Sequence, residues 1–473
     1  MYYAFLFLVS VGIIAITQNV VLIAIWVFLW VFASKYKTAT KESGFLMFFI
    51  AFMLLWPVTA ISFRGIHTHG VVFFLIMMSY FLRFGYHSIR QIRKYKVVNL
   101  LFWGWVIWCI LGYFPIFYNS MGGNYSDAST VLISLHRETT MLKSVAPILG
   151  TAVVFLIPIC GIKNEHDLMS FLNALTQGTL ILLVLSLVRY IFEFDFFPQS
   201  YVKVRSMGFR MSGFSMPDPN GFGRMLLIPL LFLVAYAVKF PRLLKMYHLL
   251  TLFVGILCII LTFSRTTYFS FTFGVGIILI LSLTNFRSYK FLLSLIVLLF
   301  LILWLSPVLS YFGPGSDRAT TGTLVSRMYV WDRALIVLSI SPWFGLHPGG
   351  WVGLLTINPE FAFGGAVQSA HSLYLQTAVE WGLPMFGLVL LSIILTILNG
   401  WRVVRRLKSM PEQSRGLVQG SAYAVVIVPL AFFVHGIAEN IPHYFIFFVL
   451  GISVALRNLA QDILSHFQLG NSS

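Results

Sequence analysis

The sequence predicts an all-α fold, a polytopic transmembrane helical bundle of about 12–14 spans that forms a single integral membrane domain over residues 1–473. Hydrophobic residues make up 59% of the chain and charged residues 10%, and the mean hydropathy is +0.88. A soluble domain is about 25% charged. Apolar runs recur along the whole chain, and most approach the ~20 residues that a helix needs to cross about 30 Å of hydrocarbon.

The predicted spans follow these runs in chain order. The first run, 2–33, is interrupted by Thr17, Gln18 and Asn19, so it forms either one long tilted helix or two short ones. It has no basic start and no cleavage site, which argues against a removable signal peptide. The later long runs are 44–62, 97–118, 169–192, 248–262, 268–283, 291–311, 374–399 and 422–434. Shorter runs that fit a polytopic bundle are 71–82, 146–160, 225–238 and 444–456.

The distribution of charge predicts the topology. When the loops are assigned alternately to two sides, one side holds 20 of the 32 Lys and Arg residues and 5 of the 15 Asp and Glu residues. A basic surplus of this kind marks the cytoplasmic side. The net charge of +17 therefore indicates topology and contact with anionic membrane lipids, and nucleic-acid binding is not expected.

The opposite, extracytoplasmic side is nearly neutral and holds the long loops, where binding and catalytic residues are usually found. These loops are 119–143, 195–224 and 312–373. The loop 195–224 carries arginines and an Asp-Pro-Asn motif. The large loop 312–373 leads into the helix of His371 and contains short amphipathic helices. Within it, 326–340 has helical periodicity, with an apolar face formed by Met328, Trp331, Leu335 and Leu338. The connections 264–267 and 438–440 face the same side.

The segment 213–221 is the first candidate site, because three arginines surround it: Arg205, Arg210 and Arg224. Asn220 is expected to cap a helix that begins near Gly221. The free N–H groups of a helix start favour an anion, and arginines match a diphosphate with two hydrogen bonds each. The alternative is a capped helix whose arginines reach lipid phosphates.

Two further arginines are candidate ligands of a phosphate. Arg265 lies in a predicted two-helix turn, Phe263-Ser264-Arg265-Thr266-Thr267, where several hydroxyl groups accompany it. Its alternative role is to extend toward the membrane interface. Arg327, in the large loop, can either reach a substrate or form an ordinary ion pair.

His371 is the candidate general base. On a helix that begins near Ser369, His371 and Tyr374 share a face, and Glu380 lies about two and a half turns further along. A histidine that titrates near neutral pH can deprotonate a hydroxyl, but a hydrogen-bonded packing role is the alternative. The other histidines lack metal-ligand spacing, and there is no glycine-rich nucleotide loop or paired-carboxylate motif. We therefore expect no metal and no cofactor.

At these residues the chain resembles the O-antigen ligase and polymerase superfamily, membrane enzymes that join lipid-linked glycans in the bacterial periplasm. Three blocks in the family's order carry the resemblance, over roughly residues 200–400: 213–221, 263–266 and 327–382. The last contains Pro342-Trp343-Phe344-Gly345-Leu346 and His371-Ser372-Leu373-Tyr374-Leu375 followed by Glu380-Trp381-Gly382. Ligases of the family often have Asn after the histidine, where this chain has Ser372.

The resemblance implies a glycan donor carried on undecaprenyl diphosphate. Arg210 and Arg265 would hold the diphosphate, and His371 would be the base for an acceptor sugar hydroxyl that attacks the anomeric carbon. Arg205, Arg327, Asn220 and Tyr374 are further candidates for substrate binding. Glu380 would either orient polar groups behind His371 or pair with an arginine. The implied location is the bacterial inner membrane, with the active face in the periplasm.

The sequence leaves the acceptor open. A polymerase extends O-antigen or exopolysaccharide chains on the lipid carrier, whereas a ligase moves glycan onto lipid A-core or protein. A chain-length regulator and a flippase are expected partners in either case. A transporter or flippase of an anionic solute would need polar residues near the membrane midplane, and Arg189 is the one charge placed well within a predicted span. In a non-catalytic scaffold, His371 would be replaceable.

Overall fold

A computed structural model describes residues 20–36, 41–55, 62–63, 66–120, 141–192, 210–216, 218–282, 321–346, 350–357, 369–408 and 412–470. Their regular secondary structure is helical, apart from one antiparallel pair of two-residue strands, β1 (Ser62–Phe63) and β2 (Ile66–His67). The predicted all-α class is confirmed. The helices are α2 Val20–Ser34, α3 Lys41–Leu55, α4 Thr68–Ile92, α5 Lys96–Ser120, α7 Met141–Gly161, α8 Glu165–Phe192, α10 Pro219–Lys239, η1 Pro241–Leu243, α11 Met246–Thr262, α12 Arg265–Ile280, α15 Thr321–Ile340, α16 Gly350–Ile357, α17 Leu373–Leu407, α18 Glu412–Ala438 and α19 His443–Gly470.

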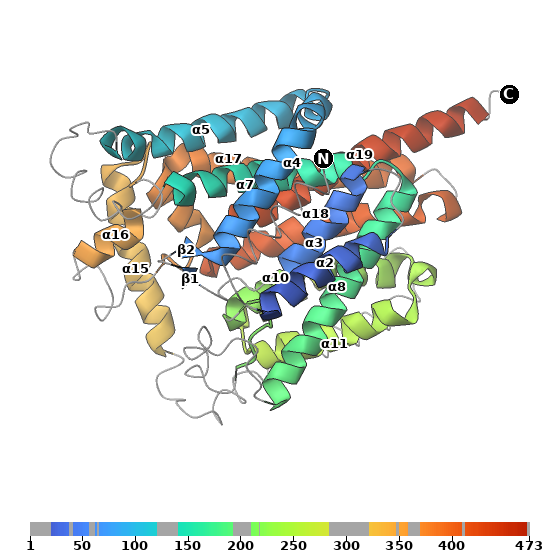
Figure 1. The fold of residues 1–473 in the computed structure, drawn as a ribbon, viewed down its shortest axis with the longest axis horizontal. Helices are drawn as coiled ribbons and strands as arrows, with labels where there is room; N and C mark the ends of the chain where they lie inside the picture. The colour runs from blue at the N-terminus through green and yellow to red at the C-terminus, as the bar shows by residue number, and fades with distance from the viewer. Residues whose placement is uncertain are drawn as a thin grey trace.

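Helix α18 is central to the bundle. It packs against α10, α12, α17 and α19, and α19 packs in turn against α7. A large apolar core runs through these helices. Figure 1 shows α15 and α16 together at one end of the bundle, where α15 contacts α17. The beginnings of α10, α12 and α17 and the α18–α19 connection carry the candidate site residues described below.

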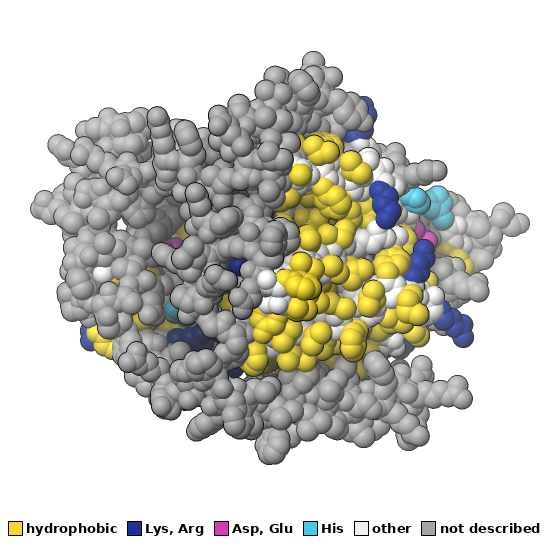
Figure 2. Space-filling model, turned by 60° about the horizontal axis from the view of Figure 1, so that its bottom comes forward, with side chains coloured by type: hydrophobic (Ala, Val, Ile, Leu, Met, Phe, Trp, Pro, Cys, Tyr) yellow, Lys and Arg dark blue, Asp and Glu magenta, His cyan; other side chains and the backbone are white. Residues whose placement is uncertain are grey.

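Five helices of the described part are long and apolar enough to cross a membrane: α8, α10, α17, α18 and α19. Shorter apolar stretches lie in α2, α5, α7, α11 and α12. Large apolar side chains such as Leu100, Phe253 and Ile280 are exposed, and Figure 2 shows a broad apolar face with Lys and Arg side chains along one edge. The total of 12–14 spans stays a prediction, because the run 291–311 and most of the first run lie outside the described residues.

One predicted detail of the helices is wrong. The run 44–62 does not form one helix, since α3 ends at Leu55 and Ser62 pairs in β1. Helix α15 forms in the large loop as expected, and Met328 and Leu335 on its expected apolar face are exposed. Val330, Ala334 and Val337 are buried and pack with residues of α16, α17 and the segment before α17. Contact of the exposed apolar side with a membrane surface stays a prediction.

A kink in α17 fixes the position of α15. Gly382 has φ 79° and ψ 171° inside the helix, a conformation that is essentially restricted to glycine. A Cβ atom at Gly382 would lie 1.9 Å from the Trp343 carbonyl oxygen. Leu383 N–H donates to the Pro342 carbonyl (2.8 Å) and Leu346 N–H to the Val379 carbonyl (2.7 Å). The turn after α15 is therefore held directly against the α17 backbone.

The variant Gly382→Ala is expected to unfold at a lower temperature than the wild type in detergent. The left-handed backbone costs an alanine about 1–3 kcal/mol, and its methyl group collides with the Trp343 carbonyl. Thermal unfolding measured by tryptophan fluorescence checks this. Gly387→Ala is the matched control, because it lies on the same helix with open space around its added methyl group. Equal unfolding temperatures for the two variants would contradict the role given to the kink.

Candidate functional site

His371 lies in a sharp turn immediately before α17. Ser372 is the N-cap of α17, and its hydroxyl accepts from Leu375 N–H. The expected helix start near Ser369 is therefore wrong, and His371 has a left-handed backbone with φ 46°. A left-handed conformation is uncommon for a residue other than glycine. The turn directs His371 toward the α18–α19 connection, whereas the Tyr374 hydroxyl donates to the Phe433 carbonyl (2.9 Å). The two side chains do not share a helix face.

Arg265 is presented by the same local arrangement. Phe263 is left-handed with φ 49° and ends α11, and Ser264 caps α12 by accepting from Thr267 N–H. Arg265 is then the first residue of α12, and its side chain is exposed. In each block a left-handed residue is followed by a serine cap that starts a helix. The predicted two-helix turn is confirmed.

The start of α10 differs from the prediction at one residue. Asp218, not Asn220, is the N-cap, and its carboxylate accepts from the N–H groups of Asn220 and Gly221. Pro219 is the first helical residue, a position that suits its fixed φ. Because Asp218 accepts hydrogen bonds from the free N–H groups at the start of α10, the Asn220 side chain is available for tertiary contacts. It accepts from Arg210 Nη2 (2.7 Å) and donates to Glu439 Oε1 (3.2 Å).

Glu439, in the connection between α18 and α19, joins two of the three sequence blocks, 213–221 through Asn220 and 327–382 through Arg327 and His371. Its Oε1 also accepts from Arg327 Nη2 (2.8 Å), and its Oε2 lies 3.8 Å from His371 Nδ1. The 3.8 Å between His371 Nδ1 and Glu439 Oε2 is longer than a hydrogen bond, so the two groups make an electrostatic contact. The Glu439 carbonyl accepts from Leu373 N–H (3.2 Å). Asn220, Arg327 and His371 thus contact one carboxylate, and Arg210 joins them through Asn220. We call these four residues and Glu439 the Glu439 cluster.

The environment keeps the Glu439 carboxyl ionised. Its side chain is only 9% exposed, and burial by itself would raise its pKa. The interaction with His371 and the positive charge of Arg327 outweigh burial, so the pKa of Glu439 lies below its ordinary value. Since His371 Nδ1 faces this carboxylate, the Nε2 atom is the one left to contact a ligand.

Arg210 and Arg265 form the cationic part of the site. Arg210 Nε donates to the Thr262 carbonyl (3.0 Å), which ties it to the end of α11, and its Nη1 makes no hydrogen bond within the described residues. Burial lowers the pKa of the Arg210 guanidinium; the nearby Asp218 and Glu439 oppose this effect, and the positive charge of Arg265 adds to it. Arg265 is therefore near enough to Arg210 for the two positive charges to repel each other.

The segment before α17 is held from two sides. Trp331, one turn after Arg327 on α15, donates from Nε1 to the Ala370 carbonyl (2.8 Å), and Ala370 N–H donates to Gln376 Oε1 (2.8 Å). Helix α15 therefore supplies Arg327 to the cluster and also fixes the backbone next to His371. Precise placement of this kind is what a general base needs.

The structure brings together part of the predicted set. His371, Arg327, Asn220 and Arg210 meet, and Arg265 is nearby. Glu380 lies further along α17, where it accepts from Gln376 Nε2 (2.6 Å), and the carboxylate beside His371 belongs to Glu439. Arg205 lies outside the described residues. No group of three His, Cys, Asp or Glu side chains in the described ranges could hold a metal ion.

The sequence prediction put the connection 438–440 on the same side as His371 and Asn220, and Glu439 does contact both, but the prediction did not select Glu439. The available signal was the scarcity of acids, since the chain has only 15 Asp and Glu residues. An acid between two apolar helices is costly unless it is paired. A search for a partner of His371 among such acids would have included Glu439.

Comparison with known families finds one match: residues 250–392 match the family described as O-antigen ligase. The matched stretch contains Arg265, Arg327, His371 and Glu380, whereas the 213–221 block and Glu439 lie outside it. The resemblance to the O-antigen ligase and polymerase superfamily is confirmed over this stretch. A search of curated proteins finds no match. Together with the five apolar helices, the match indicates a multi-pass membrane protein with an O-antigen ligase or polymerase type of function.

Proposed function

We propose that this protein is a metal-independent glycosyltransferase that polymerises glycan units carried on undecaprenyl diphosphate, as O-antigen or exopolysaccharide, at the periplasmic face of the bacterial inner membrane. The observation that carries the proposal is the Glu439 cluster. It places His371, Arg327 and Asn220 around one buried carboxylate, and Asn220 in turn holds Arg210. The family match over residues 250–392 supports the reaction class.

The donor's diphosphate is the ligand that fits Arg210 and Arg265. Arginine is suited to phosphate oxygens because its planar group offers several N–H donors. Arg210 is fixed by Asn220 and Thr262, so it needs little reorganisation when negative charge develops on the leaving diphosphate. The exposed Arg265 can approach the same oxygens from the start of α12, whose N–H groups favour an anion.

His371 takes the proton from the acceptor sugar hydroxyl. The hydroxyl oxygen forms a bond to the anomeric carbon of the donor while the bond from that carbon to the diphosphate oxygen breaks. The electron pair of the broken bond stays on the lipid diphosphate, where the arginines stabilise it. The proton moves to Nε2 of His371, and Glu439 stabilises the imidazolium through Nδ1.

A ligase that transfers the glycan to lipid A-core or to protein is the second candidate. The description of the matching family favours it. The two reactions share the donor, the leaving group and the general base, so the Glu439 cluster serves both. They differ in the acceptor, which is a second lipid-linked glycan in a polymerase.

The glycan profile of a strain that lacks this protein tests the proposal. A polymerase predicts that long chains disappear while single repeats remain attached to lipid A-core, as seen on a gel of the extracted lipopolysaccharide. Polymer that accumulates on undecaprenyl diphosphate would instead identify a ligase. Restoration by the wild-type chain is the control. A strain with unchanged surface and lipid-linked glycans would contradict both functions.

A further inference from the structure

A polar cavity of about 260 Å³ lies close to the Glu439 cluster but is separate from it. Arg224, which lines it, is one helical turn after Asn220 on α10, and the side chains from α17 begin with Leu373, two residues after His371. The connection after Glu439 closes the third side. The lining residues are Arg224, Leu373, Gln376, Thr377, Glu380, Trp381, Asn440, Ile441, Pro442 and His443.

The lining offers hydrogen-bond donors and acceptors together. Gln376 Nε2 donates to Glu380 Oε1 (2.6 Å), and the Thr377 hydroxyl is 2.8 Å from His443 Nε2. Arg224 Nη1 donates to the Asn440 carbonyl, but its Nε is buried and has no hydrogen-bond partner within the described residues. This buried nitrogen is not open to the cavity, so the donors and acceptors available to a ligand are the other polar groups of the lining.

The charges of the lining favour a neutral ligand. It contains one guanidinium, Arg224, and one carboxylate, Glu380. A diphosphate would meet Glu380, so it fits Arg210 and Arg265 better. Sugar hydroxyls both donate and accept hydrogen bonds, which matches the mixed lining, and Leu373 and Trp381 offer apolar surface to the C–H groups of a ring.

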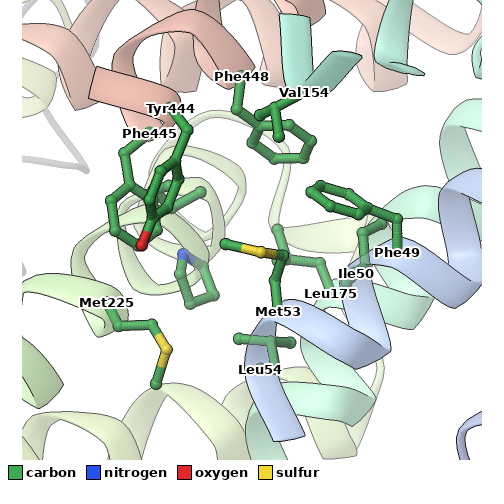
Figure 3. Close-up of a pocket in the computed structure, with 12 residues that line it drawn as sticks. Phe49, Ile50, Met53, Leu54, Val154, Leu175, Met225, Tyr444, Phe445 and Phe448 are labelled. Carbon is green, nitrogen blue, oxygen red and sulfur yellow. The ribbon is translucent and has the colours of Figure 1, made fainter. Parts of the chain in front are cut away.

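The size of the cavity limits the ligand to about one ring. Small-molecule sites measure roughly 300–1,000 Å³, and this cavity of about 260 Å³ is just below that range. A second cavity differs from it in being small and apolar. Met225 and Tyr444, the chain neighbours of Arg224 and His443, line an apolar cavity of about 40 Å³ together with Phe49 and Met53 (Figure 3). That second cavity cannot hold a sugar ring.

We propose that the polar cavity is a carbohydrate subsite, which binds one sugar ring of the glycan next to the residue that reacts at His371. This assignment rests on the proposed function. It divides the substrate between two places: the diphosphate at Arg210 and Arg265, and one neutral sugar at Arg224, Thr377 and Glu380. Glu380 is then a sugar-binding residue, one turn after Gln376.

Sugar binding to the detergent-purified full chain tests the subsite without any transfer reaction. The probes are the monosaccharides released by acid hydrolysis of the host's own polysaccharide, each titrated by saturation-transfer NMR. We expect one of them to bind the wild type. Glu380→Gln and Thr377→Val should each weaken its binding about ten-fold, the usual effect of losing one hydrogen bond to a charged group or of leaving one buried partner unpaired. Thr396→Val is the matched control, because Thr396 lies on the same helix and bonds only to the Ser392 carbonyl.

The outcomes separate the subsite from the proposed function. Binding that is lost in both cavity variants and retained in Thr396→Val and His371→Ala supports the subsite. If no monosaccharide binds, or if both cavity variants bind as the wild type does, the subsite is overturned even where transfer activity is present. A protein that binds the sugar through Glu380 but makes no glycan product would overturn the proposed transfer reaction alone. Size-exclusion profiles verify that each variant is folded. If Thr377→Val does not fold, the binding of Glu380→Gln alone decides the test.

Discussion

Cells whose only copy of this protein carries His371→Ala are expected to make no long-chain glycan. Without the imidazole, the acceptor hydroxyl has no group to take its proton, and loss of a general base slows a reaction by about 10²–10⁴-fold. The His371 side chain is 32% exposed and lies outside the apolar core, so the variant should still insert in the membrane. A gel of extracted glycan, with immunoblotting of the membrane fraction, measures both properties.

His466→Ala is the matched control for this experiment. His466 is an exposed histidine near the end of α19, far along the chain from the Glu439 cluster, and its loss should leave the glycan profile unchanged. Normal long chains in cells that carry only His371→Ala would overturn the role of His371 as base. If the His371→Ala protein is missing from the membrane fraction, the same glycan gel is run with His371→Gln, which keeps a polar side chain at that position.

The sequence predicts the helical architecture well and singles out the candidate arginines, for physical reasons. Membrane-spanning helices need long apolar runs, and these are visible without knowledge of tertiary contacts. Arg210 and Arg265 stand out because charges are scarce in such a chain; Arg265 is also the first residue of α12, and Arg210 lies in the segment that leads into α10. His371 stands out for the same reasons. In all three cases local chemistry identifies the residue.

The connections among these residues could not be predicted, because they depend on tertiary contacts. Asn220 has the side chain of a helix cap, but Asp218 takes that role two residues earlier and leaves Asn220 to bridge Arg210 and Glu439. Glu439 follows His371 by 68 positions in the chain, and no short-range pattern links them. Glu380, nine residues from His371, was the nearer carboxylate in sequence but lies further along α17.

The left-handed backbone at His371 also depends on tertiary contacts. A positive φ is rare for phenylalanine and a minority conformation for histidine, although histidine adopts it several-fold more often than most residues. The sequence therefore contains only a weak signal for the conformation of His371 and none for that of Phe263. The conformation at His371 is imposed by neighbours, because Trp331 and Gln376 bind Ala370 and Ser372 caps α17. Strain held by surrounding contacts is frequent at functional sites, and here it turns the imidazole away from α17 and toward Glu439.

Glu439→Ala is expected to reduce glycan transfer by about a hundred-fold. Loss of the carboxylate that orients a catalytic histidine can cost about 10⁴-fold, and the smaller effect expected here reflects the 3.8 Å separation from Nδ1. Arg327 and the Asn220 amide would also lose an acceptor, and removal of one partner from a buried ion pair destabilises by about 3–5 kcal/mol. Transfer rates and thermal unfolding of the purified variant measure the two effects.

Glu439→Gln separates charge from shape and adds a test by pH. The pKa of Glu439 is lower in the folded protein than its ordinary value, so ionised Glu439 stabilises the fold above the ordinary pKa. That contribution is lost as pH falls through the lowered, folded-state pKa. Wild-type protein should therefore lose thermal stability between about pH 5 and about pH 3 by more than Glu439→Gln does, since an amide does not titrate. Glu412→Gln, at the first residue of α18, is the control for loss of an acid elsewhere. If Glu439→Gln and the wild type lost equal stability over this interval, the carboxylate would not be the charge that Arg327 and His371 share, and the cluster would owe its arrangement to hydrogen bonding alone.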